Sequence, residues 1–198
     1  MPSSDPVPAL PERRPVDLAH ASRLVNHGPT VLVATAHGGR RNVMAAAWSM
    51  PVEFTPPRIA VVVDKSTFTR ELLAASGRFA IGIPCPPLAD LTYAVGSESG
   101  RDVDKFARHA IGWQPGPAFG LPWIDGCVAW MELRHIPEVH AEQAYDTVFG
   151  EVVSAAADPR VFAAGRWSFR DDNMGLHTLH HLGAGAFAVP SRVVQGRR

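Results

Sequence analysis

The stretch N-V-M-A-A-A-W-S-M-P-V-E-F-T-P-P-R-I-A-V-V-V-D-K-S-T-F-T, residues 42–69, decides the fold. Its first part, 42–49, is mostly small and apolar and predicts a strand, and prolines mark an expected bend over 51–57. The run 59–63 combines β-branched residues with alanine, which is typical of a strand buried on both faces. A Ser/Thr-rich segment follows, and the good helix formers after it predict a helix that continues through residue 75.

The start of this expected helix has the composition of an anion site. Unpaired backbone N–H groups converge where a helix follows a buried strand, and Ser66, Thr67 and Thr69 add hydroxyl groups. Lys65 adds a positive charge that would strengthen hydrogen bonds to a phosphate. The alternative is that Ser66 or Thr67 only caps the helix, with Glu71 in its first turns. The residues alone leave both readings open.

The bulk composition indicates one soluble globular domain. The 198 residues suffice for one full core, and 46% hydrophobic and 19% charged residues are ordinary for a globular protein. Basic and acidic side chains balance at 19 each, without a basic stripe, so we expect no nucleic-acid partner. No apolar run is long enough to span a membrane, and the N-terminus lacks the apolar core of a secretory signal. We therefore expect a cytoplasmic protein without membrane contact.

Two cysteines, Cys85 and Cys127, form neither a disulfide framework nor a metal cluster.

Residues 1–15 contain five prolines and predict a flexible, extended N-terminal arm, which leaves residues 16–198 as a single domain. The other expected elements are a short helix within 16–27, a strand at 30–36, a hairpin turn at 37–40, a strand at 78–83, a helix at 86–95, a strand at 128–136 with a possible partner at 138–145, a strand at 147–156 with a bulge or bend at Gly150, and a tail from 176 that begins as a helix.

This order predicts six or seven strands, mostly antiparallel, with about three short helices. Closing such strands into a barrel would remove the sheet edges. No G-x-G-x-x-G motif is present, so a Rossmann dinucleotide site has no support.

Six segments in a fixed order carry a resemblance to a known family. They are N-V-M-A-A-A-W at 42–48, P-P-R-I-A-V-V-V at 56–63, K-S-T-F-T-R-E-L-L at 65–73, S-G-R-F-A-I-G-I-P at 76–84, S-G-R-D-V-D-K-F at 99–106 and F-G-E-V at 149–152. No single segment is specific, but the ordered set resembles the flavin reductase-like FMN-binding split-barrel family, closest to its flavoredoxin-type branch. The resemblance covers roughly residues 28–189.

The resemblance implies a mainly β protein with short helices, folded as an antiparallel Greek-key split β-barrel. It also implies a homodimer with FMN, rather than FAD, in a groove near the dimer interface. The implied activity is a flavin reductase that transfers hydride from NAD(P)H to flavin. Two alternatives stay open: an FMN-carrying electron-transfer protein that meets a redox partner protein without NAD(P)H activity of its own, and an oxidoreductase acting on another substrate with tightly bound flavin.

The resemblance also implies a set of cofactor-binding residues, in which the small alanines would let a flat flavin ring lie against the backbone. This set is Asn42, Ala45, Ala46, Ala47, Trp48, Ser49, Lys65, Ser66, Thr67, Thr69, Ser99, Gly100, Lys105 and Phe106. Each assignment has a plainer alternative: the alanines could face a packed helix, Trp48 and Phe68 could be ordinary core residues, and Asn42 could hold the strand end instead of the ribityl chain.

The segment 96–106 is polar and hinged by glycine, and it predicts a functional loop with no packing pattern. Arg101 departs from the family pattern there. The alternative is a surface turn in which Asp102 and Asp104 pair with Arg101 and Lys105.

Three histidines near the C-terminus, His177, His180 and His181, form an H-x-x-H-H pattern. On a helix the first and last would share one face, a spacing that metals favour, but no acidic third ligand is evident, so we expect no metal site. The resemblance places this stretch near the mouth of the flavin site, where His180 and His181 could meet the substrate. A purely structural role is the alternative.

The segment 112–124 is strongly apolar and rich in proline and glycine, and with Trp130 it carries three of the five tryptophans. One narrow barrel core can hardly hold all these rings, so the segment predicts the homodimer interface. The alternative is that it folds back over its own barrel as a lid.

Overall fold

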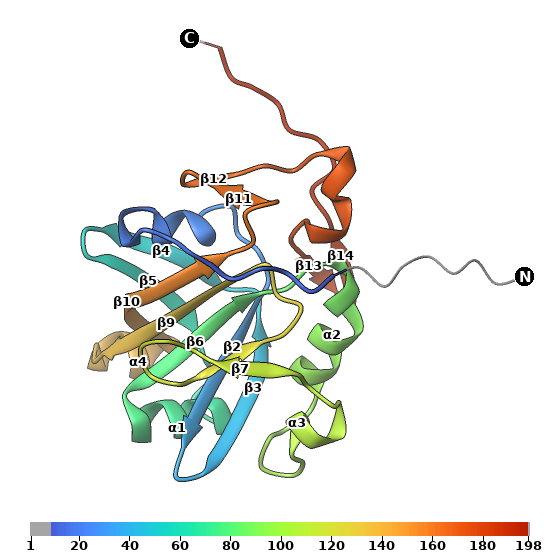
Figure 1. Cartoon of the computed structure of the whole chain (residues 1–198). Helices are drawn as coiled ribbons and strands as arrows, with labels where there is room; N and C mark the ends of the chain where they lie inside the picture. Colours follow the sequence, from blue (N-terminus) through green and yellow to red (C-terminus); the bar gives the residue numbers. More distant parts are fainter. Residues whose placement is uncertain (1–8, 198) are drawn as a thin grey trace, which may run out of the picture.

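The computed structural model describes residues 9–197, and it is built on one antiparallel sheet (Figure 1). In the described residues this sheet has eight strands, with seven of them in the order β3-β2-β6-β9-β10-β5-β4 and β1 paired with β10. The strands are β1 (Arg14–Pro15), β2 (Val31–His37), β3 (Arg40–Ala46), β4 (Ser49–Phe54), β5 (Pro57–Val62), β6 (Arg78–Ile83), β9 (Ala129–Ile136) and β10 (Thr147–Ala157). The expected mainly β, antiparallel class is confirmed.

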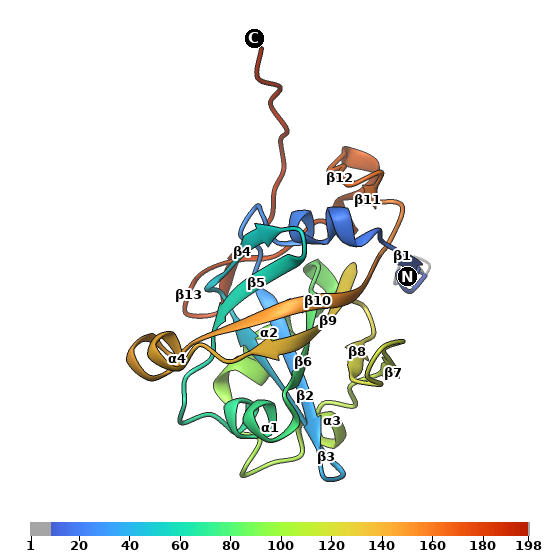
Figure 2. The same ribbon diagram turned by 90° about the vertical axis from the view of Figure 1, so that its left-hand side faces the viewer.

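Three smaller strand pairs and seven short helical segments complete the fold of residues 9–197. The pairs are β7 (Trp113–Pro115) with β8 (Pro122–Ile124), β11 (Phe162–Ala163) with β12 (Arg166–Trp167), and β13 (His180–Gly183) with β14 (Ala186–Ala188). The helical segments are η1 (Leu18–Leu24), α1 (Phe68–Ser76), η2 (Pro86–Leu88), α2 (Ala89–Ser97), α3 (Lys105–Arg108), α4 (Val139–Tyr145) and η3 (Asp171–Leu176). Figures 1 and 2 show α1 at one end of the sheet and α2 running beside β3.

The strand β10 links two parts of the sheet. It pairs with β9 along its length, with β5 through its first half and with β1 at its last residues. A bulge between Val152 and Ser154 separates the two halves. Because a bulge bends its strand, β10 can run from one partner to the next.

The sheet curls round but does not close. Inner-face residues of β2 and β5, which stand four places apart in the strand order, belong to one buried cluster. The end strands β3 and β4 are nevertheless unpaired with each other, although only residues 47 and 48 separate them in the chain. The expectation that closure removes every edge is therefore wrong, and the chain itself crosses the open gap between the two edges.

Several local expectations need correction. Residues 51–57 are not an irregular bend, because β4 pairs with β5 in a hairpin. The segment 138–145 does not extend the sheet, since most of it is helix α4. Gly150 is not the bulge: a Cβ there would lie 2.6 Å from the Phe79 ring, so glycine makes room for that ring inside the barrel.

Two hydrophobic clusters cover both faces of the central strands. One fills the inside of the curled sheet and includes Phe79 and Met131. The other lies between the outer face and the elements α2, α3 and β7–β8, where Trp123 stacks on Trp130 with ring centroids 6.0 Å apart. Both tryptophan rings are buried in the chain's own fold. The reason given for a dimer interface at 112–124 is therefore wrong, and the alternative of a lid over the barrel is confirmed.

The expected N-terminal arm, residues 1–15, is only partly within the described residues, because residues 1–8 lie outside them. Its last part is extended and lies on the domain. Arg14 and Pro15 pair with the end of β10, and Arg13 forms an ion pair with Asp125. In residues 9–197 no helix is long and apolar enough to cross a membrane.

Candidate functional site

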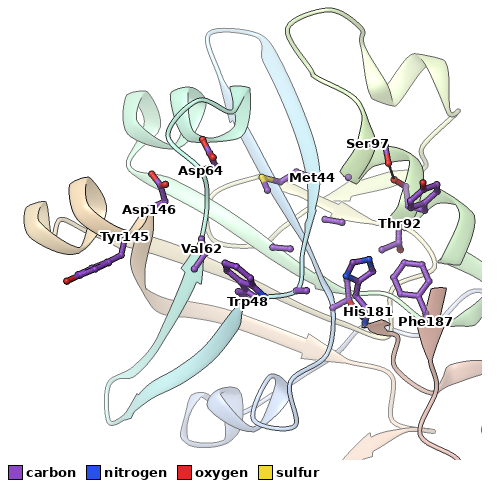
Figure 3. A pocket seen from close by; sticks show the side chains of 16 residues that line it. Met44, Trp48, Val62, Asp64, Thr92, Ser97, Tyr145, Asp146, His181 and Phe187 are labelled. Carbon is purple, nitrogen blue, oxygen red and sulfur yellow. Dashed lines mark hydrogen bonds between the residues drawn. The ribbon is translucent and has the colours of Figure 1, made fainter. Parts of the chain in front are cut away.

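A cavity of about 620 Å³ opens at the gap between β3 and β4. Figure 3 shows Asp64, Asp146 and Tyr145 on one side of it and Thr92, Ser97, His181 and Phe187 on the other. We call this cavity the ring end. It is lined by Thr30, Met44, Ala45, Ala46, Ala47, Trp48, Val62, Asp64, Thr92, Tyr93, Gly96, Ser97, Tyr145, Asp146, His181 and Phe187.

The edge of β3 gives the ring end free backbone groups. The Val43 carbonyl points away from β2, because it accepts a hydrogen bond from the Lys105 side chain on the opposite side of β3. Backbone groups alternate along an edge strand, so the N–H and C=O of Ala45 also point to the open side. Gly96 lets α2 approach closely, since a Cβ there would lie 3.2 Å from the Ala45 Cβ. Ala45 therefore does both things considered from the sequence: it packs near a helix and it lines a cavity.

Some polar side chains at the ring end are hydrogen-bonded within the protein, and others have no partner there. Thr92, on α2, is buried, and its hydroxyl has no hydrogen-bond partner among the described residues. The His181 backbone N–H donates to the Thr30 hydroxyl at 2.9 Å, and the His181 ring lies 5.6 Å from the Phe187 ring. An unpartnered buried hydroxyl is costly in the free protein, and this one is available to a ligand at the ring end.

A second cavity of about 290 Å³ continues from the ring end, because Met44, Gly96 and Ser97 line both. We call it the anion end, and the two together the groove. The anion end is lined by Asn42, Met44, Ser66, Thr67, Phe68, Thr69, Val95, Gly96, Ser97, Glu98, Ser99, Gly100, Arg101 and Lys105.

Lys105 is the buried cation of the anion end. Its side chain is 3% exposed, and Nζ donates to the Val43 carbonyl at 2.9 Å and the Val95 carbonyl at 2.7 Å. An ammonium group has three N–H donors, so one is left for a ligand. Burial lowers the pKa of Lys105 to about 8, against the nearby charge of Glu98, which raises it. The expectation that segment 96–106 has no packing role is wrong, since Lys105 and Phe106 are both core residues.

Asn42 and Gly100 form a tight crossing beside this lysine. The Asn42 Nδ2 donates to the Thr69 hydroxyl at 2.8 Å, while its Oδ1 is buried without a partner. A Cβ at Gly100 would lie 2.1 Å from that Oδ1, so only glycine fits. The free Oδ1 is available to accept a hydrogen bond from a ligand hydroxyl.

The start of α1 is capped by its own chain. The Thr67 hydroxyl accepts from the Arg70 N–H, and the Ser66 N–H donates to the Asp64 carboxylate at 2.7 Å. Hydrogen bonds from Ser66 lower the pKa of Asp64. Thr67 as a helix cap, one of the two alternatives from the sequence, is confirmed. Glu71 pairs with Arg101 instead of closing a capping box.

Lys65 does not line the groove. Its Nζ donates to the Gln143 carbonyl at 2.8 Å and lies 3.2 Å from the Asp146 carboxylate, so it holds α4. The lysine of the anion end is Lys105, the first residue of α3, 40 residues later in the chain.

Three other predicted residues lie outside the groove lining, and these are Ser49, Phe106 and His180. Ser49 opens β4, and Phe106 belongs to the outer core. The Thr178 hydroxyl forms hydrogen bonds with the His180 ring, at 3.0 Å, and with the His27 ring. Burial lowers the pKa of His27 to about 4 and lowers that of His180, so both rings are neutral at pH 7.

The H-x-x-H-H pattern does not lie on a helix. His177 is buried and bonds the Pro190 carbonyl, whereas His180 and His181 are successive residues of β13 and point to opposite sides. His181 lines the ring end, whereas His180 does not. Among residues 9–197 no group of three His, Cys, Asp or Glu side chains could hold a metal ion.

A profile of the flavin reductase like domain matches residues 23–171, well over half of the chain. The chain belongs to the flavin reductase-like family. This flavin reductase-like chain is 58% identical over 183 residues to the uncharacterized protein YddH of Escherichia coli (strain K12), across 91% of this chain and 96% of that protein.

Two solved structures place the fold within the split-barrel group. The FMN-binding domain of a flavin reductases-like enzyme from Shewanella baltica OS155 shares 37% identity with a TM-score of 0.92, over 96% of this chain and all of that one (100%). Flavoredoxin of Desulfovibrio vulgaris (Miyazaki F) shares 22% identity with a TM-score of 0.73, over 99% and 97% of the two chains, and shows the fold alone. The resemblance read from the sequence and the split-barrel fold are both confirmed.

Part of this flavin reductase-like groove is formed by residues with little signal in the sequence. Asp64 is next to two of the family motifs and Arg101 lies within one, but Thr92, Tyr93, Tyr145 and Phe187 come from segments that carry no motif. Only the packing of α2, α4 and β14 around the gap brings them together. A neighbouring pair of aromatic and polar residues, such as Thr92-Tyr93, was the one signal available.

Proposed function

We propose that the groove binds FMN, with the flavin ring at the ring end and the phosphate at the anion end. The observation that carries this proposal is the buried Lys105 ammonium, which has a spare donor at one end of a long cavity and small residues at the other. Groove volumes of this order are usual for cofactor sites. The unpartnered oxygens of Asn42 and Thr92 lie along the same groove, where a ribityl hydroxyl and a flavin ring could satisfy them.

The residues of the chain hold and shield the proposed cofactor. Free N–H groups on the edge of β3 are placed to donate to the heteroatoms of the ring, while Trp48 and His181 flank the opening. Lys105 neutralises the phosphate, and Asn42 fixes the chain between ring and phosphate. Bound flavin itself supplies the capacity to take up a hydride.

We further propose that NAD(P)H is the hydride donor and that the protein is a flavin reductase. No acid–base pair is required of the protein for such a transfer, because the cofactors carry the chemistry. The exposed Trp48 side chain lines the ring end, where it offers a flat face to a second planar group. Such a reductase would act in the cytoplasm, where reduced nicotinamide nucleotides are available.

Two measurements on the purified protein test these proposals. Its absorbance spectrum, before and after titration with FMN, is expected to show flavin bands approaching one flavin per chain. Oxidation of NADH and NADPH with FMN, FAD or riboflavin then measures the reductase activity. Flavin binding without nicotinamide oxidation would favour the electron-carrier alternative, and no flavin binding would contradict the proposed function.

We propose that two copies associate through β4. The side chains at alternate positions, Trp48 just before β4 and Met50, Val52 and Phe54 within it, are all exposed, with Trp48 at 74% and Phe54 at 72%. Exposed apolar patches of this kind usually mark an interface, and this one continues into the groove through Trp48. A second copy would cover the open strand edge and the mouth of the site.

Light scattering at micromolar concentration tests the dimer, with the flavin bound. Phe54→Lys should convert the dimer to a monomer because it buries a charge in an apolar contact. Exposed Val139→Lys, on α4, is the matched control, because Val139 lines no part of the groove, and it should leave the mass unchanged. The mass of a single chain, 21.3 kDa, for the unaltered protein would contradict the proposal.

A further inference from the structure

A separate cavity of about 460 Å³ lies beside the N-terminal arm, away from the ring end. In Figure 2, β1, β7 and β8 lie to the right, whereas α4 and β13, which contribute to the ring end, lie to the left. The cavity is lined by residues within 13–18 and 114–117, together with Trp123 and 153–156. We call it the arm cavity. None of its lining residues lines the ring end or the anion end, so it is not part of the groove.

The arm cavity has an apolar floor and an apolar rim. Trp123, Ala155 and Ala156, which line it, are all buried. The small side chains of the two alanines leave the space above the last part of β10 open. Pro115 and Pro117 stand exposed at the rim. Concave sites of this volume, with apolar walls and a few polar groups, are typical of small-molecule binding.

The indole N–H of Trp123 has no hydrogen-bond partner among residues 9–197, although the residue is only 6% exposed. A tryptophan N–H usually finds an acceptor when it is buried. The other indole groups of the core follow this rule, since Trp130 donates to the Ile124 carbonyl at 2.8 Å and Trp167 donates to the Arg23 carbonyl at 2.9 Å. A ligand oxygen in the arm cavity would supply the acceptor that Trp123 lacks.

Arg13 is the one charged side chain among the described residues that line the arm cavity. It forms an ion pair with Asp125, which does not line the cavity, and its guanidinium lies 4.7 Å from the centroid of the Trp130 ring. Its Nε is nevertheless buried without a hydrogen-bond partner. The Ser154 hydroxyl is engaged elsewhere, because it donates to the Glu132 carboxylate at 2.9 Å. The lining therefore offers one cation and two unpartnered N–H donors, and it presents no carboxylate.

We propose that the arm cavity binds an apolar monocarboxylate, such as an aromatic acid, at a site separate from the flavin groove. The carboxylate accepts hydrogen bonds from Arg13 Nε and Trp123 Nε1, and the apolar body of the ligand packs on the floor. A charge-assisted hydrogen bond is roughly twice as strong as a neutral one, so the acid is favoured over its amide. A strongly hydrated anion such as phosphate is disfavoured, because apolar walls do not replace its water. This proposal does not depend on flavin binding.

Two other occupants compete with this ligand. Ordered water would satisfy the two donors, but it gains nothing from the apolar floor. A second copy of the chain would cover the apolar rim, as interfaces commonly do. The single cation and the absence of a carboxylate in the described lining favour the acid over both.

The test compares naphthoate, naphthamide and naphthylmethylammonium, which share one ring system and differ in charge. Calorimetry should show naphthoate bound about tenfold more tightly than naphthamide, and no binding of the cation. Trp123→Phe removes the N–H and keeps an aromatic ring beside Trp130, and it should weaken naphthoate about tenfold. Trp113→Phe is the matched control, because this partly buried tryptophan of β7 lines no part of the cavity. It should leave the naphthoate affinity unchanged.

Arg13→Gln should abolish the preference for naphthoate over naphthamide, because it removes the only cation of the described lining. All three variants should keep the FMN affinity of the unaltered protein, which shows that the fold is retained. Equal affinities of the unaltered protein for naphthoate and naphthamide, or binding of neither, would overturn the inference and leave the proposed function standing.

Two further outcomes would also overturn the inference. A naphthoate affinity that falls when FMN is present would place the probe in the groove, whereas we expect no change. A fall in molecular mass on addition of naphthoate, measured by light scattering, would assign the arm cavity to contact with a second copy. We expect the mass to stay constant.

Discussion

The two ends of the groove differ in the chemical groups that line them. The ring end uses small side chains, an open strand edge and one unpartnered hydroxyl, so its shape is set largely by the backbone. The anion end uses a buried lysine, an amide and a hydroxyl that hydrogen-bond within the core. A change at the anion end should therefore distinguish FMN from riboflavin, whereas a change at the ring end should affect both flavins alike.

The largest effect is expected for Lys105→Met. Loss of one charge-assisted hydrogen bond to the phosphate costs about 1.5–3 kcal/mol, which weakens FMN about tenfold to a hundredfold. Riboflavin, which has no phosphate, should bind as before. Fluorescence titration with both flavins measures this difference. Equal weakening of riboflavin would show that Lys105 supports the fold of the groove and not the phosphate.

The pH dependence of FMN affinity should follow Lys105. Its pKa of about 8 in the free protein means that the ammonium loses its proton above that pH. Bound phosphate favours the charged form, so FMN affinity should fall by up to about tenfold per pH unit above pH 8. Riboflavin affinity should stay level. A parallel fall for both flavins would assign the titration to another group.

The same titration has the opposite effect on the stability of the flavin-free protein. Because burial lowers the pKa of Lys105 from its ordinary 10.5, the unfolded chain holds that proton to higher pH. Unfolding then takes up a proton between about pH 8 and 10.5, so this group adds stability as the pH rises through that window. Urea denaturation of the unaltered protein and of Lys105→Met across this range isolates the contribution.

A smaller effect is expected at the ring end from Thr92→Val. This change removes the unpartnered hydroxyl and keeps the shape of the side chain. FMN and riboflavin should both weaken about fivefold, for one neutral hydrogen bond of about 1 kcal/mol. The flavin-free protein should become more stable, since a buried hydroxyl without a partner is costly. A loss of affinity for FMN alone would contradict the expectation that changes at the ring end affect both flavins alike.

The smallest effect is expected for Lys65→Ala, the change that the sequence alone would have ranked first. Lys65 lies outside the groove in an exposed pair with Asp146, and such pairs contribute at most about 1 kcal/mol. The affinities for FMN and riboflavin should both change less than about twofold. A tenfold loss of FMN affinity would show that Lys65 belongs to the phosphate site.

Much of the fold could be predicted from local pattern. The hydrophobic runs of β2, β6 and β9 are distinctive because both faces of these strands are covered. The polar composition of 138–145 carries no clear period, and packing near β10 lets this segment form a helix instead of the expected strand. The prolines of 51–57 predict a bend because proline disfavours central strands, but β4 is an edge strand and tolerates them.

The site was harder to predict because its chemistry depends on contacts distant in the chain. Both lysines, Lys65 and Lys105, stand beside motif residues, and nothing local says which one turns inward. Asp146 and the Gln143 carbonyl hold Lys65 outside the groove. The Val43 and Val95 carbonyls hold Lys105 inside it. The alanines of β3 were predictable, since a flat ligand on a backbone needs small side chains.

The place of β10 in the sheet has a consequence for synthesis on the ribosome. The β4–β5 hairpin and the β3-β2-β6-β9 group stand on either side of β10 in the strand order. Both leave the exit tunnel before residues 147–157, so neither group can join the other until that late strand emerges. A nascent chain cut short before β10 should expose the inner faces of both groups and depend on chaperones, whereas release of the strand should complete the barrel in one late step.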